Sequence, residues 1–333
     1  MAGIDRRRVM ASVGLAALGA FAAGCAPGSG GGSAGTPAGD DQLAERRKPR
    51  PPRAGGIGGT GIVGTVTALG SIVINGLRIE LDDRTVVSDA FGPRRVEALG
   101  PGLSLTVEAE RETSDGPLIA RTVQLSHPVI GQAAAEGPTG LSVAGVPVRL
   151  LPGVGAPRPD ARVAVNGLWE GDTVVASRLD PAPGAADVLA GAVDVVAGQV
   201  QGRQVSGPAA RFLPAPVAYV TLIGRAVPGG FEATSLVSGR FAGGITQLEQ
   251  LVVEGYLRPV EGVPGVAISG LGHSMDAGVR LAGFDGRTLL AGPYTGLFEP
   301  GLGVSLPEAA GERRDLLVPG LDLARAPGGR PTR

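Results

Sequence analysis

Cysteine and histidine are almost absent from this chain of 333 residues, which contains one cysteine and two histidines. A single thiol, Cys25, cannot form a disulfide within the chain and cannot supply a multi-cysteine metal site. Catalysis by a histidine base can involve only His127 or His273. We therefore expect no metal site and no cofactor.

Aromatic residues and net charge are also scarce. Aromatic side chains make up 3% of the residues and hydrophobic ones 43%, so the cores must be built from Val, Leu, Ile and Ala. The net charge of −1 implies no strongly basic face, and we expect no nucleic-acid partner. The 57 glycines and 28 prolines show no Gly-X-Y period, which excludes collagen and favours frequent turns between short strands.

The amino terminus has the three-part layout of an export signal. Arg6 and Arg7 belong to a cationic start, residues 9–23 are apolar and rich in alanine and glycine, and small residues follow. This apolar stretch is shorter than the roughly 20 residues that a membrane-spanning helix needs. The arginine pair is similar to a twin-arginine translocation signal, although Asp5 replaces the usual serine or threonine. The general secretory route is the alternative.

The sequence Ala-Ala-Gly-Cys that ends at Cys25 resembles a lipobox. In that motif a diacylglycerol is attached to the cysteine thiol and the signal is cleaved after the preceding residue, here Gly24. We therefore predict a signal peptide over 1–24 and a membrane lipid on Cys25, with an ordinary cleaved signal as the alternative. The predicted location is the periplasmic side of the cell envelope. Ala26, where an aspartate would favour the inner membrane, indicates the outer membrane.

Residues 25–55 have the composition of a lipidated flexible linker. Residues 28–35 are rich in glycine and serine, and residues 46–53 are basic and contain proline. The basic run suits contact with anionic lipid or glycan surfaces. A solvated spacer is the simpler interpretation.

From residue 56 onward, short runs of alternating apolar residues are separated by turn residues, which is typical of an all-β sandwich or barrel. The first region predicts strands over 64–69, 71–75, 77–81, 103–109 and 118–125. Asn75 and Gly76 predict a type I′ hairpin turn between the second and third strands. The long connection 82–102 could hold one helical turn, over 93–99.

This pattern recurs along the chain, which indicates tandem modules. Residues 141–150 repeat the pattern of 72–81, with Gly145 in the place of Gly76. The predicted fold class is all-β, with tandem five-stranded OB-like barrels or small β-sandwiches after a disordered signal and linker. The predicted modules span 56–126, 127–183, 190–240 (degenerate) and 245–300, followed by a frayed tail over 301–333.

The glycine-rich segment 55–62 and the sequence 70–76 together resemble an exported bacterial family, catalogued as domain of unknown function 5666. The resemblance implies an export or lipoprotein signal, a glycine-rich entry segment and tandem copies of a short β module. It is strongest over residues 55–125 and implies no catalytic residue.

Several motifs carry residue types used in catalysis or cation binding but lack the required context. Residues 56–61 match G-x-G-x-x-G without a preceding strand or a following helix, so we expect irregular backbone packed on the first module. His273, Ser274 and Asp276 lack the nucleophile-elbow pattern and suit a polar loop. The acidic pairs at 40–41 and 82–83 lack the ligand spacing of calcium loops and suit linker and turn roles.

Trp169 is the only tryptophan and follows an Asn-Gly-Leu sequence at a predicted strand end. On the face of an OB-like barrel, an aromatic side chain can stack on a sugar or a base. Trp169 is therefore a candidate ligand-face residue, with an anchor in the core or between modules as the alternative.

These features predict a membrane-anchored envelope lipoprotein that acts as a non-catalytic binding or scaffold protein. Its ligand is undefined, with an envelope protein or a glycan as candidate partners. One alternative is an envelope hydrolase or carbohydrate-active protein with a carboxylate site between modules. Another is an assembly factor that binds partners by strand addition.

Overall fold

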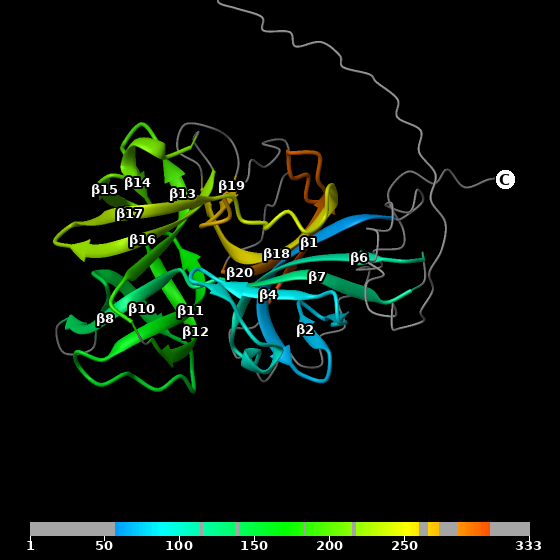
Figure 1. Ribbon diagram of the computed structural model, residues 1–333, viewed down its shortest axis with the longest axis horizontal. Helices are drawn as coiled ribbons and strands as arrows, with labels where there is room; N and C mark the ends of the chain where they lie inside the picture. The colour runs from blue at the N-terminus through cyan, green and yellow to red at the C-terminus, as the bar shows by residue number, and fades with distance from the viewer. Residues whose placement is uncertain are drawn as a thin grey trace, which may run out of the picture. The chain divides into compact units, whose positions relative to one another are not determined.

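The computed structural model describes residues 57–113, 116–136, 140–182, 184–214, 218–259, 266–272 and 286–306. The chain divides into two units, Met1–Pro52 and Arg53–Arg333, and every described residue belongs to the second. The predicted signal and linker, with Arg6, Arg7, Gly24 and Cys25, lie outside the described residues. In the described part, β-strands dominate and the only helices are two short 3-10 turns, which confirms the all-β class (Figure 1). None of the described helices has the length and apolar character needed to span a membrane.

Five strands of the first region form a closed ring, which we call barrel one. They are β1 (Ile57–Ala68), β2 (Ile72–Ile74), β3 (Leu77–Glu80), β6 (Ser104–Arg111) and β7 (Leu118–Leu125). β1 pairs with β2, β2 with β3, β3 in parallel with β7, β7 with β6, and β6 again with β1. This strand order is that of a five-stranded Greek-key barrel of the OB type. The predicted OB-like barrel is therefore confirmed here.

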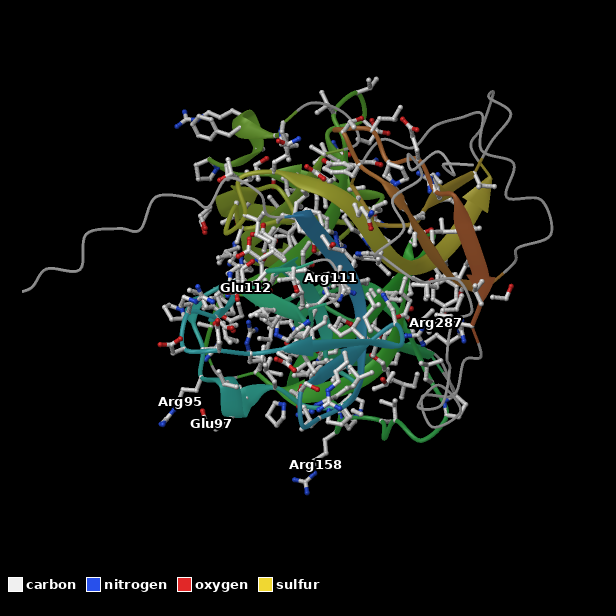
Figure 2. The ribbon with its side chains drawn as sticks, turned by 90° about the vertical axis from the view of Figure 1, so that its right-hand side faces the viewer. Arg95, Glu97, Arg111, Glu112, Arg158 and Arg287 are labelled. Carbon is white, nitrogen blue, oxygen red and sulfur yellow. The ribbon has the colours of Figure 1, made fainter. Side chains whose placement is uncertain are left out.

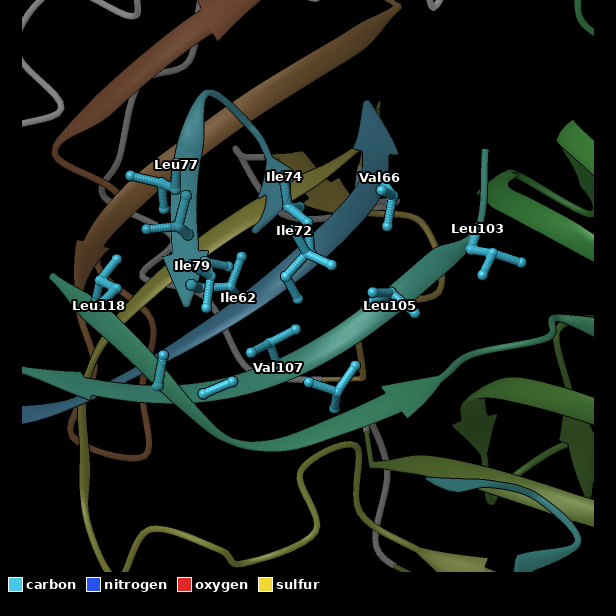
Figure 3. Close-up of a cluster of buried hydrophobic side chains, with 14 of the residues drawn as sticks. Ile62, Val66, Ile72, Ile74, Leu77, Ile79, Leu103, Leu105, Val107 and Leu118 are labelled. Carbon is cyan, nitrogen blue, oxygen red and sulfur yellow. The ribbon is translucent and has the colours of Figure 1, made fainter. Parts of the chain in front are cut away.

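The core of barrel one follows the alternation seen in the sequence. In β3, Leu77 and Ile79 are buried while Arg78 and Glu80 are exposed. Aliphatic side chains from all five strands fill the interior, as Figure 3 shows. Each fully buried Val, Leu or Ile side chain contributes about 1.5–3 kcal/mol to folding. The cluster contains no aromatic residue, in agreement with the composition.

The same pairing order recurs twice in the ten-stranded sheet that follows. Barrel two consists of β8 (Val129–Glu136), β9 (Gly140–Val143), β10 (Val146–Leu150), β11 (Arg162–Glu170) and β12 (Thr173–Pro181). Barrel three consists of β13 (Asp187–Asp194), β14 (Gln199–Val200), β15 (Arg203–Ser206), β16 (Tyr219–Val227) and β17 (Gly230–Ser238). Parallel contacts β10–β12 and β15–β17 match β3–β7. The antiparallel contacts β11–β8 and β16–β13 close the rings.

Each barrel has the same tight turn between its second and third strands. Two consecutive residues there have positive φ angles, between 47° and 75°, as a type I′ turn requires. The pairs are Asn75 with Gly76, Ala144 with Gly145, and Gln201 with Gly202. The hairpin predicted at Asn75 and its repeat at Gly145 are therefore confirmed.

The three barrels differ in the connection that follows their third strand. In barrel one this connection contains a small hairpin, β4 (Val86–Asp89) and β5 (Gly92–Pro93), and the 3-10 helix η1 (Val96–Ala98), inside the predicted helical turn. Barrel three has only the 3-10 helix η2 (Ala210–Phe212) at this place. Barrel two has neither over residues 151–161.

A fourth β region packs onto barrel one. Its strands are β18 (Leu248–Pro259), β19 (Val266–Ile268), β20 (Arg287–Pro293) and β21 (Leu302–Ser305). β18 runs parallel to β1, and the two regions share one eleven-stranded sheet. β21 pairs with β20, so the expectation that residues 302–305 belong to a frayed tail is wrong: their backbone completes a sheet ladder.

The glycine-rich segment also differs from its prediction. Its described residues belong to β1, which pairs with β6 on one side and β18 on the other, whereas irregular backbone was expected. Glycine is needed because neighbouring side chains occupy the space of a β-carbon. A Cβ on Gly59 would lie 2.4 Å from Ile245 Cγ2, and one on Gly61 would lie 2.6 Å from Leu251 Cδ2.

Two buried carboxylates fasten the fourth region to barrel one. Glu254 of β18 accepts a 2.8 Å hydrogen bond from the Thr65 backbone N–H and pairs with Arg287 of β20. Figure 2 labels Arg287. Arg287 also donates to Thr65 Oγ1 at 2.8 Å. We call Thr65, Glu254 and Arg287 the buried junction. Glu108 of β6, likewise buried, accepts backbone N–H bonds from residues 243–245.

Candidate functional site: a cleft between barrels one and two

A cleft of about 280 Å³ lies between barrels one and two. One wall comes from the β4–β5 hairpin and the end of β7, and the other from β11 and β12. The polar or aromatic side chains that line it are Asp89, Phe91, Arg94, His127, Arg178 and Asp180. Its volume is close to the lower end of the range for small-ligand pockets.

The first wall is organised by Asp89. Its carboxylate accepts a 2.8 Å hydrogen bond from the Phe91 backbone N–H and a 2.6 Å bond from Arg94 Nε. The first of these bonds closes a tight turn, and Gly92, with φ of +130°, follows at a backbone conformation that only glycine adopts easily. The turn places Phe91 on the cleft with 48% of its surface exposed.

The second wall carries a similar ion pair. Arg178 Nε donates to Asp180 Oδ1 at 2.8 Å, and Asn166 Nδ2 donates to Asp180 Oδ2 at 2.9 Å. Arg178 and Asp180 are two residues apart on β12, so they share one face of the strand. Arg178 Nη1 also donates to the Pro101 carbonyl of barrel one at 3.2 Å. This bond links β12 of barrel two to barrel one.

His127, in the short connection from barrel one to barrel two, lines the same cleft. It is buried, and its Nδ1 has no hydrogen-bond partner among the described residues. Burial lowers the pKa of His127, and the charges of Asp89 and Asp180 partly oppose that shift. The imidazole is therefore neutral at pH 7. A buried nitrogen without a partner is rare and requires an explanation.

Trp169 does not lie on an open face, so its ligand-face assignment is wrong. Only 3% of its surface is exposed, and its Nε1 donates to the Ala190 carbonyl at 2.9 Å. Gly270 of the fourth region packs against the indole, since a Cβ there would lie 2.3 Å from Trp169 Cδ1. Trp169 is an anchor between β regions, which was the alternative interpretation.

Of the two acidic pairs, only the one at 82–83 lies in the described part. Asp82 lies in the turn after β3. It accepts hydrogen bonds from Arg84 of the same turn and from Arg121 of β7. Burial acts to raise the pKa of Asp82, but these bonds outweigh it and lower the pKa to about 2. The carboxylate is thus already neutralised by arginine, as a turn role implies. His273, Ser274, Asp276 and the pair at 40–41 lie outside the described residues.

The residues that form the cleft, apart from His127, were not singled out by their sequence pattern. The available signal for the first wall was the sequence Asp-Ala-Phe-Gly at 89–92, a turn inside the long connection 82–102. For the second wall it was the arginine and aspartate two positions apart on a predicted strand. Neither signal shows that the two walls face each other.

No protein-family model, curated protein or solved structure matches the chain. The assignment of function therefore depends on the residues and geometry of the chain itself.

Proposed function

We propose that the chain is a lipid-anchored, non-catalytic binding protein of the cell envelope. Cys25 is the lipid acceptor, and the cleft between barrels one and two is the binding surface. The signal layout and the lipobox-like sequence ending at Cys25 support the anchor, and Ala26 favours the outer membrane. The resemblance to the exported family 5666 agrees with this address.

The observation that carries the binding assignment is the cleft itself, a space of about 280 Å³ lined by the half-exposed Phe91 and by the partly exposed arginines of two ion pairs. Small-ligand sites combine apolar surface with a few polar groups of this kind. The ion pairs on both walls offer further donors and acceptors around the same space.

Binding fits the cleft better than the two alternatives. Both aspartates that line it are held by arginines, whereas a glycosidase uses one carboxyl group that gives a proton and another that attacks or activates water. Strand addition requires an exposed sheet edge. Barrels one, two and three close their ladders into rings, which removes such edges from them.

The anchor is tested by replacing the proposed lipid acceptor. Wild-type protein should fractionate with membranes and carry a diacylglycerol on Cys25 by mass spectrometry. Cys25→Ser should move to the soluble envelope fraction, because the thiol is absent. Unchanged membrane fractionation of Cys25→Ser, together with an unmodified wild-type cysteine, would contradict the anchor.

The binding surface is tested by photo-crosslinking in living cells. A benzophenone amino acid replaces Phe91 in the cleft or, as a matched control, Phe212, which is 62% exposed on η2. Illumination should give a crosslinked species at position 91 and none at position 212. No product at 91, or the same product at both positions, would refute the cleft as the binding surface.

A further inference from the structure

The charges around the cleft cancel. Asp89 pairs with Arg94 at 2.5 Å, and Asp180 pairs with Arg178 at 2.7 Å. These four groups sum to zero formal charge, and burial keeps His127 neutral. A charged ligand would find each opposite charge in the cleft already paired, so it would have to compete with an existing ion pair. An uncharged polar ligand pays no such penalty.

The groups that remain accessible are suited to hydroxyls. The side chains of Arg94 and Arg178 are 45% and 37% exposed, and that of Asp180 is 27% exposed. Guanidinium groups donate hydrogen bonds and carboxylates accept them. Neighbouring hydroxyls both donate and accept, so they can bond to an arginine and an aspartate together without separating the pair.

The rest of the lining is apolar and includes one accessible aromatic ring. Phe91 is half exposed, and Ile130, Ala164 and Pro181 supply aliphatic surface. A pyranose ring has one face of C–H groups that can cover an aromatic ring, while its edge carries the hydroxyls. Such a molecule matches a cleft in which a ring and neutralised ion pairs line the same space.

We propose, on the basis of the binding function above, that the cleft binds an uncharged pyranose unit of a glycan. The sugar stacks on Phe91, and its hydroxyls bond to Arg94 and to the Arg178–Asp180 pair. A larger groove on barrel one, of about 460 Å³, is lined by Leu69, Arg78 and Glu97. It contains no buried unpartnered polar atom among its described lining residues, and it provides a control surface.

The test uses the full mature chain in saturation-transfer NMR and calorimetric titrations. The probes are methyl glycosides of glucose, galactose, mannose and N-acetylglucosamine, with glucuronate and glucosamine as charged comparators. At least one neutral sugar should bind, and its charged counterpart should bind about tenfold more weakly. Phe91→Ala should weaken binding about tenfold. Phe212→Ala and Leu69→Ala should leave the Kd unchanged, because these side chains lie outside the cleft.

Equal or tighter binding of glucuronate or glucosamine would overturn the preference for a neutral ligand. Binding that survives Phe91→Ala but is lost in Leu69→Ala would move the site to the other groove. No binding of any neutral sugar would refute the sugar proposal. In that case crosslinking at position 91 decides separately whether the cleft still binds a different partner.

Discussion

The buried junction and the cleft contain the same chemical groups, but the junction joins two β regions whereas the cleft is the proposed binding surface. In both places, arginine pairs with a carboxylate beside a strand from another part of the chain. In the junction, the side chains of Arg287 and Glu254 are 2% and 0% exposed, and their bonds join residues of three strands. In the cleft, both arginines are partly exposed and a histidine nitrogen lacks a partner. The junction and the cleft therefore differ in how far their ion pairs are exposed to solvent, and not in the types of residue that form them.

A fourth ion pair, on the surface, shows the other extreme. Arg95 and Glu97 of the η1 region lie 3.6 Å apart, with 90% and 77% of their side chains exposed, and they point outward in Figure 2. Pairs of this kind contribute between zero and about 1 kcal/mol, because water and salt screen them. The four pairs thus form a series from buried, in the junction, through partly exposed, in the cleft, to fully exposed.

Removal of one partner at the buried junction should have the largest effect on stability. Arg287→Met leaves Glu254 buried without its counter-charge, which should cost about 3–5 kcal/mol in unfolding free energy. Urea denaturation of the mature chain measures this loss. Arg95→Met, the exposed control, should change it by less than about 0.5 kcal/mol. Equal effects of the two substitutions would contradict the distinction between junction and surface.

The cleft should respond to mild acid. Because the pKa of His127 is lowered in the folded state, the unfolded chain binds more protons once the pH falls below about 6.5. Stability should therefore decrease as the pH falls through this range. The charged groups that face the imidazole are Asp89, Asp180 and Arg94. His127→Gln should flatten the curve of urea midpoint against pH between 8 and 5. An unaltered slope in the variant would show that His127 does not cause it.

The smallest predicted effect concerns Asp82 in the turn of barrel one. Its pKa of about 2 lies below the unfolded value of 3.8, so its bonds with Arg84 and Arg121 stabilise the fold above pH 4. This contribution should disappear as the pH falls from 4 to 2. Because the side chain is partly exposed, the loss should be about 1 kcal/mol. Comparison of wild type with Asp82→Asn by acid titration measures it; identical acid curves would contradict it.

Local chemistry made the barrel modules predictable. Asn75 and Gly76 fix a turn through their own backbone preferences, and Leu77 and Ile79 mark the buried face of a strand through alternation. The repeat over residues 141–150 shows the same apolar alternation and a glycine, Gly145, at the matching turn position. These features depend on residues that are neighbours in the chain, so sequence is sufficient to find them.

The cleft and the covering of Trp169 depend on contacts between distant segments. Arg178 faces the turn at Asp89 only because barrels one and two pack together. The strand pattern around Trp169 is compatible with an exposed face and with a buried one. Gly270, which is distant in the sequence, packs on the indole and makes the face a buried one. Alternation within a strand shows which residues share a face. It does not show which other strand covers that face.

The most direct test of the cleft is hydrogen–deuterium exchange of the mature chain with and without solubilised cell envelope. The proposal predicts protection of the backbone around residues 89–94 and 178–182 on addition of envelope, with unchanged exchange around Glu254 and Arg287. Protection confined to the groove at Leu69 or to the fourth β region, or no protection at all, would contradict it.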